Sequence, residues 1–254
     1  MSINPRETPE GAIRYNTDSN KMECYVNNKW MIVSTSSPNL DGGGRGVAAG
    51  GNDPGQIDTI QYITIPTQGN AIDFGNLTAP TQGSLAATGS STRGLIGGGQ
   101  RFPAQVNVID LITFSSTGNA IDFADLTVAR GQLSGSGSQT RGIFGGGQPG
   151  PSVVDTIDYV TIASTGTNAV DFGNLTSTRR MLTAASSPTR SLFFAGLNPS
   201  STNVIDFITI STTGNAQDFG DASVAMYSSG AVSSKTRAVM MGGYDGNPNY
   251  VNTM

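Results

Sequence analysis

The side chains that could carry out chemistry in this chain are few in kind. Its 254 residues include no histidine and a single cysteine, Cys24, alongside 15 Asp and 3 Glu. Without imidazole, a Ser-His-Asp triad, a Cys-His pair and a histidine-ligated zinc site are impossible. Two carboxyl groups can still hydrolyse a glycosidic bond, so a carbohydrate-degrading enzyme stays open as a hypothesis. Calcium binding by Asp and backbone carbonyls also stays open, although no D-x-D-x-D-G loop occurs.

The charge of the chain is low and slightly negative. Lys and Arg number 14 against 18 Asp and Glu, a net charge of -4, and charged residues make up 13% of the chain. Only three of the cations are lysines, and no basic stripe of the kind that neutralises phosphates occurs, so we predict no nucleic-acid partner. No run of 18 apolar residues occurs, which predicts a soluble chain without membrane insertion.

An internal repeat is the strongest signal in the sequence. One arginine per repeat is followed by a largely apolar run that ends in glycine, and successive arginines are 48, 48, 49 and 47 residues apart. The five arginines are Arg45, Arg93, Arg141, Arg190 and Arg237. One acid per repeat also recurs, and this set is Glu23, Asp73, Asp122, Asp171 and Asp218.

Each repeat holds four short segments of β character. They are rich in Ile, Val, Thr, Tyr and Phe, are bounded by Gly, Asn, Asp, Pro and Ser, and show no helical apolar period. Four strands in about 48 residues match one blade of a β-propeller, in which kelch-type and similar repeats have ~40 to 50 residues. The sequence therefore predicts an all-β fold, a kelch-like β-propeller.

The two ends of the chain fit the same repeat. Residues 11–24 align without a gap with residues 61–74, which places Cys24 at the position of Phe74. The C-terminal residues stop just before the segment that this alignment supplies. The N-terminal segment is therefore predicted to resume the repeat where the C-terminus leaves it.

This alignment predicts five blades. Residues 11–254 divide into five repeats of about 49 residues. We predict that the last blade is closed by strands from both termini, residues 11–30 and about 225–254, because an open ring would expose strand edges and an apolar face. Residues 1–10 lie outside the repeat and are expected to form an N-terminal arm.

The recurring arginines and acids suggest two hypotheses. A guanidinium makes charge-assisted hydrogen bonds with a carboxylate, so the two sets are predicted to form structural ion pairs, one per blade. The alternative is functional: the five arginines would surround the axis and bind an anion or the carboxylate of a glycan.

The loops after the glycine runs differ from repeat to repeat. Because they share one position in the repeat, they should cluster on one face of the disc, where a rigid frame usually carries recognition residues. The side chains best able to anchor a partner there are Arg101, Phe102, Tyr244 and Tyr250. The alternative is that these loops have drifted without a function.

A phenylalanine that recurs elsewhere in the blade is expected to pack between neighbouring sheets, and this set is Phe74, Phe123, Phe172 and Phe219.

The repeat resembles that of kelch-type propellers, with an apolar strand ending in Gly-Gly and a Tyr-containing strand (Tyr62, Tyr159), although Asp-Phe stands where kelch repeats carry Trp. The R-G-x-x-G-G-G, I-D-Y-V-T-I and G-N-A-x-D-F-G-x-L-T repeats resemble virion structural proteins of tailed bacteriophages, most of all marine and cyanobacterial phages. The opening T-P-E-G-A-I-R-Y-N-T-D-S-N and Trp30 resemble tail-fibre-like proteins. The resemblance covers almost the whole chain, implies a virion component and transfers no catalytic residue.

We therefore predict a non-enzymatic phage virion structural protein, assembled in the host cytoplasm and either tail-associated or decorating the capsid. It would act as a rigid propeller module for assembly and for host adsorption through a surface glycan. The expected partners are other virion proteins, further copies of the chain on the particle and the host glycan, with no cofactor and no metal. Two alternatives stay open: a glycan-degrading propeller enzyme (depolymerase), and a lectin-like binding module outside a virion.

Overall fold

A computed structural model describes residues 8–19, 21–33, 44–164 and 166–246 of the chain. The regular structure of these residues consists of strands, with no helix, so the all-β prediction is confirmed. None of the described residues forms a helix long and apolar enough to cross a membrane. The chain divides into two compact units, residues 1–39 and 40–254.

The first unit contains one three-stranded antiparallel sheet, the N-terminal sheet. Its strands, in spatial order, are β1 (Ile13–Asn16), β2 (Lys21–Val26) and β3 (Lys29–Ile32). Asn27 and Asn28 connect β2 to β3 with φ of 51° and 59°, as a tight two-residue hairpin requires. Side chains paired across antiparallel strands share a face, which gives one face of this sheet an apolar, largely exposed set: Ile13, Tyr15, Met22, Val26 and Met31.

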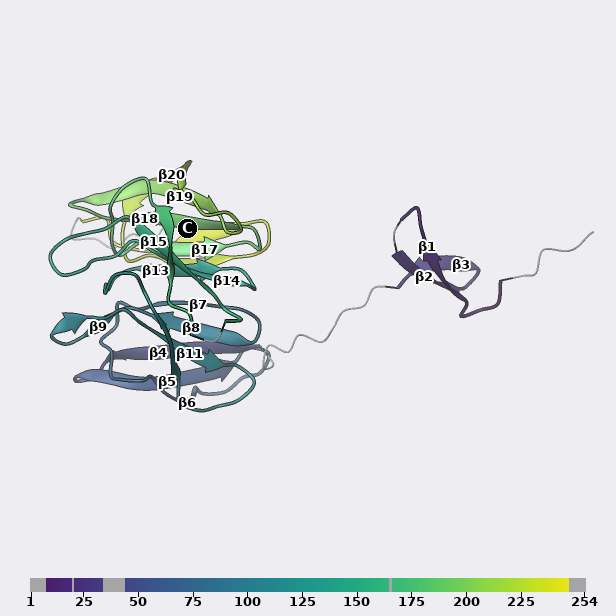
Figure 1. Cartoon of the computed structure of the whole chain (residues 1–254), viewed down its shortest axis with the longest axis horizontal. Coiled ribbons are helices and arrows are strands. Elements are labelled where there is room, and N and C mark those ends of the chain that lie inside the picture. The colour runs from purple at the N-terminus through teal and green to yellow at the C-terminus, as the bar shows by residue number, and fades with distance from the viewer. Residues whose placement is uncertain (1–7, 20, 34–43, 165, 247–254) are drawn as a thin grey trace, which may run out of the picture. The chain divides into compact units, whose positions relative to one another are not determined.

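The second unit repeats one antiparallel meander (Figure 1), in which the strands of a complete sheet lie in chain order. Sheet I contains β4 (Arg45–Asn52), β5 (Gln56–Thr64) and β6 (Ile72–Asn76). Sheet II contains β7 (Ala86–Gly89), β8 (Arg93–Gly97), β11 (Val108–Thr113) and β12 (Ile121–Asp125), with the hairpin β9 (Gln100–Arg101) and β10 (Ala104–Gln105) between β8 and β11.

The later sheets follow the same plan. Sheet III contains β13 (Ser134–Gly137), β14 (Arg141–Gly145), β15 (Thr156–Thr161) and β16 (Val170–Asn174). Sheet IV contains β17 (Thr183–Ser186), β18 (Arg190–Leu197), β19 (Ser201–Thr209) and β20 (Gln217–Met226). The described part of sheet V is a hairpin of β21 (Gly230–Ser233) and β22 (Ala238–Met241).

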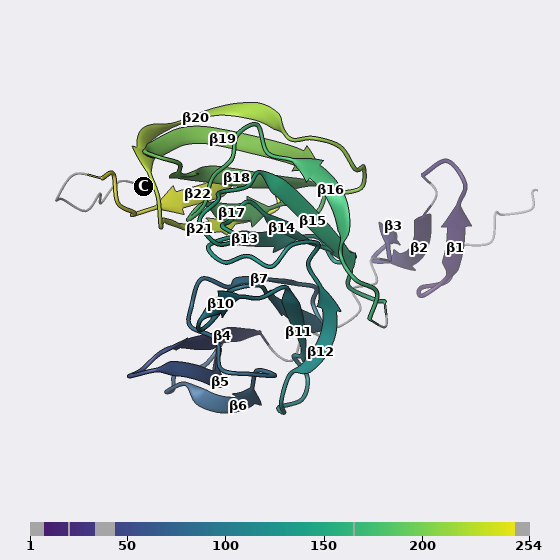
Figure 2. The ribbon, with the colours of Figure 1, turned by 60° about the vertical axis from the view of Figure 1, so that its left-hand side comes forward.

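The first strands of successive sheets contact one another, β7 with β13, β13 with β17 and β17 with β21 (Figure 2). Small residues make this approach possible. At Gly135 in β13, a Cβ atom would lie 2.3 Å from the carbonyl oxygen of Ala87 in β7. The run of Gly, Ala and Ser in the first strands is therefore required where the sheets crowd together.

A β-bulge at one place in sheets I to IV leaves a phenylalanine as the extra residue, and in sheets I to III this ring packs into the next sheet. In sheet III, Asp171 pairs with Asp158 and Gly173 with Ile157, which leaves Phe172 as the extra residue of the bulged strand. Phe172 is buried at 2% exposure. Its equivalents Phe74 and Phe123 are also buried, so the expected packing between sheets is present at these three positions.

The recurring Asn-Ala pair fastens the junctions between sheets. The backbone N–H of Asn76 in sheet I donates to Oδ1 of Asn119 in sheet II at 3.1 Å, and the N–H of Ala120 returns to the carbonyl of Asn76 at 2.8 Å. Asn174 and Asn215 repeat the side-chain contact between sheets III and IV at 3.1 Å. These asparagines therefore have a structural role.

The two ends of the sheet array are exposed. Phe219 in sheet IV has 52% of its surface exposed, although its equivalents are buried. Ile63 in sheet I is 47% exposed, whereas its equivalent Ile112 in sheet II is 3% exposed. Phe219 and Ile63 therefore lack the cover that their equivalents have, although sheet V does pack against sheet IV through Ala231, Ala238 and Met240.

The described residues do not show the predicted closure of a five-bladed propeller, because sheet V has two strands and no sheet joins it to sheet I. The pairing inside the N-terminal sheet also differs from the alignment. Gln61 pairs with Asp73 in sheet I, but Glu23, the equivalent of Asp73, pairs with Arg14, three residues beyond the aligned position. The shift places Cys24 opposite Ile13 and Met31 in an ordinary ladder, without the bulge of the other repeats.

Candidate functional site

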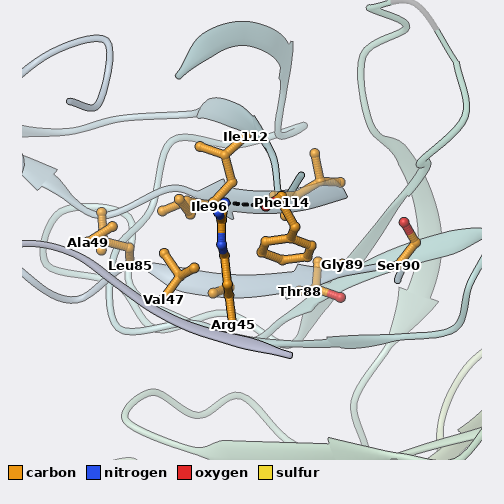
Figure 3. A pocket seen from close by; sticks show the side chains of 13 residues that line it. Arg45, Val47, Ala49, Leu85, Thr88, Gly89, Ser90, Ile96, Ile112 and Phe114 are labelled. Atoms are coloured by element: carbon orange, nitrogen blue, oxygen red, sulfur yellow. Dashed lines mark hydrogen bonds between the residues drawn. The ribbon is translucent and has the colours of Figure 1, made fainter. Parts of the chain in front are cut away.

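The recurring arginines begin the second strand in sheets II to IV, begin β4 in sheet I and directly precede β22 in sheet V. The first three of them reach the following sheet. Arg45 donates from Nη1 to the carbonyl oxygen of Phe114 at 2.5 Å, while its guanidinium lies 4.5 Å from the ring centre of Tyr62. Figure 3 shows this arginine crossing from sheet I to the sheet II residues. Arg93 donates to Ile162 at 2.8 Å and Arg141 to Ile210 at 2.7 Å in the same way. We call this contact the arginine clamp.

The last two arginines lack this contact. Arg190 lies over the ring of Phe207 at 5.0 Å. Neither Arg190 nor Arg237 donates to a carbonyl among the described residues, and the described part of sheet V has no third strand, which is the strand that precedes the accepting carbonyl at the other junctions. The clamp is therefore complete at three junctions.

Four of the recurring acids lie on the outer strand of sheets I to IV, and the fifth, Glu23, lies on the central strand of the N-terminal sheet. Asp73, Asp171 and Asp218 each accept a hydrogen bond from the glycine N–H two residues later, at 3.0 to 3.1 Å. Glu23 binds Arg14 at 2.8 Å and Asn16 at 2.9 Å inside the N-terminal sheet. Among the described residues no ion pair joins the two predicted sets, because carbonyl groups satisfy the clamp arginines and local amides satisfy three of the acids.

Other arginines and acids form buried ion pairs at the junctions. Arg130, between sheets II and III, lies 2.8 Å from Asp158 of sheet III, and both side chains are completely buried. Thr127 donates its hydroxyl and its backbone N–H to the same carboxylate, at 2.7 and 3.1 Å. Arg130 also donates to the carbonyls of Gly146 and Phe144. Every part of this ion pair is thus hydrogen-bonded, which a buried charge requires.

The next junction repeats the arrangement with one difference. Arg179 lies 2.8 Å from Asp206, and Thr176 donates to that carboxylate at 2.7 Å. The Nε–H of Arg179, however, is buried and has no hydrogen-bond partner among the described residues. Desolvation lowers the pKa of Arg179, and the charge of Asp206 opposes this shift.

The junction between sheets I and II uses an arginine from a loop. The position of Arg130 and Arg179 is occupied by Thr81, and Arg101 of the β9–β10 hairpin reaches the equivalent acid, Asp110, at 3.5 Å. Arg101 also donates to the hydroxyls of Thr81 and Thr78, at 3.0 and 3.1 Å. Desolvation raises the pKa of Asp110, while Thr78 and the charge of Arg101 oppose the shift.

The four predicted loop anchors differ in their surroundings. Arg101 is held by the junction, so its charge is used inside the protein. Tyr244 packs edge-on against Tyr227, with ring centres 5.2 Å apart. Phe102 is 76% exposed at the tip of the β9–β10 hairpin. Tyr250 lies outside the described residues.

The variable loops themselves lie side by side at their bases. Gln56 in sheet I donates to the Gln100 carbonyl of sheet II at 3.3 Å, and Ser201 in sheet IV donates to the Asp245 carbonyl at 2.9 Å. Arg180, just before sheet IV, donates to the carboxamide of Gln148 in sheet III at 2.6 Å. The loop bases therefore form one connected edge of the array.

The buried Thr-Asp-Arg junctions were not predicted as a set. Their signal is the spacing T-x-x-R at Thr127 to Arg130 and Thr176 to Arg179, combined with an Ile-Asp pair about 30 residues later. The junction between sheets I and II departs from this spacing. Thr81 stands where the other two junctions have arginine, and Arg101 supplies the guanidinium instead.

The arrangement described so far stabilises the protein and does not bring reactive groups to a surface. The carboxylates of Asp158 and Asp206 are fully buried and bound to arginine, so they are inaccessible to a substrate. Among the described residues, no three Asp, Glu or Cys side chains gather as a metal site would require. No protein-family model matches this chain, and no curated protein is significantly similar to it.

Proposed function

We propose that the protein is a non-enzymatic structural component of a tailed-phage virion, tail-associated or on the capsid, that presents one edge of variable loops to the host surface. The observation that carries the proposal is the contrast between a repeated frame, whose junctions hold arginine–aspartate ion pairs, and variable loops on its edge. Phe102 stands exposed on that edge, 76% open to solvent, while its neighbour Arg101 is held rigid. A rigid frame with variable loops is suited to recognition.

We also propose that the frame is a five-bladed kelch-like propeller whose last blade takes strands from residues 11–30 as well as 225–254. Two features support this. Arg190 lacks the carbonyl that its equivalents bind, and Phe219 lacks the cover that its equivalents have. A further strand beside β22 would supply both, because the third strand of each complete sheet does so at the internal junctions.

The predicted ligand of the loop edge is a glycan of the host surface. Weak contacts suffice for this role, because many copies on one particle convert low affinity into avidity. The exposed ring of Phe102 provides a flat apolar surface on which a sugar ring could stack.

Immunogold electron microscopy of purified particles of the encoding phage tests the proposal, with antibody raised against this chain. We expect label on intact particles. Label at tail tips supports host recognition, and label over the capsid supports decoration. Antibody against a known surface component of the same phage serves as the positive control. Intact particles that carry this control label but no label for the present chain would overturn the virion role.

A further inference from the structure

The turns at the edge of the sheets opposite the variable loops carry a second set of variable residues. The turns between the first and second strands have the pattern S-x-T-R, with Ser90, Ser138, Ser187 and Ser234 in the first place. Each serine oxygen accepts the backbone N–H of the arginine three residues later, at 3.1 to 3.2 Å. The turn is thus fixed in all four sheets. Only its second residue changes, through Ser91, Gln139, Pro188 and Lys235.

These turns line one continuous groove. A cavity of about 430 Å³ begins at Gly89, the end of β7, and runs past the turns of three successive sheets, through Gln139 and Pro188 to Lys235. A neighbouring cavity of about 240 Å³ shares Ser187, Ser234 and Lys235 with it and adds Arg190 and Arg237. The variable second residues of three turns therefore lie along one channel.

The groove offers hydrogen-bond donors and positive charge, with no carboxylate. Its larger cavity is lined by Gly, Ser, Pro, Gln and Lys, without Asp or Glu. Gln139 accepts a hydrogen bond from the N–H of Ser91 through Oε1 at 2.7 Å, which leaves its NH₂ group to donate outward. Lys235 is exposed and forms no ion pair among the described residues.

The nearby charges reinforce this polarity. Arg190 and Arg237 bring two further cations to the smaller cavity, and a clamp would occupy only one nitrogen of each guanidinium. In sheets I to IV the recurring acids lie on the outer strands, and none of them lines either cavity. The chain as a whole is negative at -4, so this groove is a local reversal of charge.

We infer that this groove binds an acidic polysaccharide, whose carboxylate or sulfate groups meet Lys235 and the neighbouring arginines and whose hydroxyls meet Gln139 and the serine turns. A polymer fits because the groove presents similar turns at regular intervals in successive sheets. The larger cavity has no aromatic side chain on which a base could stack, whereas Phe219 lines the smaller one, so single-stranded DNA is included as a comparison in the test. The inference rests on the proposed glycan recognition and assigns it a second, separate site.

Retention of the full chain on immobilised alginate, a polyuronate, tests the inference, with dextran sulfate, neutral dextran and single-stranded DNA as comparison surfaces. We expect binding to one or both acidic glycans, weakened by salt, and little retention on dextran or DNA. Lys235→Glu should reduce acidic-glycan affinity by about tenfold or more, because it places a carboxylate beside the ligand's own charge. Lys29→Glu makes the same charge change in the N-terminal sheet and should leave the affinity unchanged.

Both variants should keep the thermal unfolding midpoint of the parent protein, since both lysines are exposed. Three results would overturn the inference: no retention on either acidic glycan, equal losses for the two variants, or equal retention on dextran or DNA. Immunogold label that persists on particles under any of these results leaves the virion role intact. The two proposals can thus fail separately.

Discussion

At the scale of single residues, the buried arginines are the side chains that most need hydrogen-bond partners inside the protein. Arg130 and Arg179 are almost completely removed from water, where an uncompensated charge is very costly. The threonine that precedes each arginine by three positions binds the same carboxylate as the arginine, so acid, hydroxyl and guanidinium form one unit. This unit links two sheets, because the acid and the arginine come from neighbouring repeats.

Substitution of Asp158 tests this account. Asp158→Asn removes the partner of a buried guanidinium and should reduce the free energy of unfolding by about 3 to 5 kcal/mol. Asp171→Asn, a change of the same kind at an exposed acid that accepts one local hydrogen bond, should cost less than about 1 kcal/mol. Urea unfolding curves of the two variants provide the comparison, and similar losses would contradict the assigned role of the pair.

The N-terminal sheet contains a residue pair that responds to acid. Hydrogen bonds from Asn16 and Arg14 lower the pKa of Glu23 below its ordinary value of 4.5, and the guanidinium of Arg14 lies 4.1 Å from the ring centre of Trp30. Because the pKa is lower in the folded sheet, the stabilisation is complete above pH 4.5 and is lost as the pH falls through the lowered value.

Trp30 is the only tryptophan in the chain, so its fluorescence reports this change directly. We expect an acid transition with a midpoint below 4.5 as Glu23 is protonated and Arg14 is released. Glu23→Gln should abolish the transition. A midpoint at or above 4.5, or a transition that survives in the variant, would show that the ion pair does not control it.

At the scale of elements, the sixth residue of each second-strand segment, counted from the recurring arginine, has a positive φ where two sheets meet; it is glycine in sheet III (Gly146) and alanine in sheet IV (Ala195, φ of 55°). Gly146 has φ of +64°, and a Cβ atom there would lie 2.6 Å from the carbonyl oxygen of Arg179. The N–H of the next residue, Gly147, donates to that same carbonyl at 2.9 Å. The positive φ is tolerated by an alanine at the equivalent Ala195, so the close approach to Arg179 is what makes glycine necessary at Gly146.

The effects of backbone conformation and close approach can be separated by experiment. Gly150 has nearly the same φ, +62°, but nothing lies within 4 Å of a Cβ placed there. Gly150→Ala should cost about 1 to 2 kcal/mol from backbone strain alone. Gly146→Ala should lose roughly 2 kcal/mol more, because the added atom forces the junction apart. Equal losses in thermal unfolding experiments would show that sheet contact at Gly146 is unimportant.

The sequence predicted the elements better than the contacts between them. The spacing of Arg93 and Arg141 revealed the repeat, and their β-rich segments became strands of four-stranded sheets. The partners of these arginines were not predictable by pairing opposite charges, since a backbone carbonyl 69 residues later leaves no mark on residue type. Thr81 concealed the buried ion pairs for a related reason, because Arg101 replaces its missing charge from another segment.

The candidate site was predictable in part. The variable loops drew attention to Phe102, which is exposed, and to Arg101, which has a structural role that only its contacts reveal. The groove at the first-strand turns was not predictable, because a single changing residue in each turn, such as Gln139 or Lys235, is indistinguishable in sequence from ordinary surface variation. Its significance appears only when the turns are brought together.

At the scale of the whole molecule, the central claim is that the repeated sheets form one cooperative ring that needs the N-terminal strands. The N-terminal sheet leaves its apolar face around Tyr15 and Met22 exposed, and an exposed apolar face is typical of a surface that packs against a partner. In the second unit, Phe219 is exposed and Arg190 lacks the carbonyl that its equivalents bind. Each part thus lacks what the other could provide.

Deletion of residues 11–30 tests this claim most directly, together with a circular permutant that runs from Gly44 to Met254 and continues into residues 11–33. The account predicts that the deletion lowers the thermal midpoint sharply or abolishes cooperative unfolding, while the permutant unfolds cooperatively near the midpoint of the parent chain. A deletion variant with an unchanged midpoint, or a permutant that fails to fold, would contradict the ring.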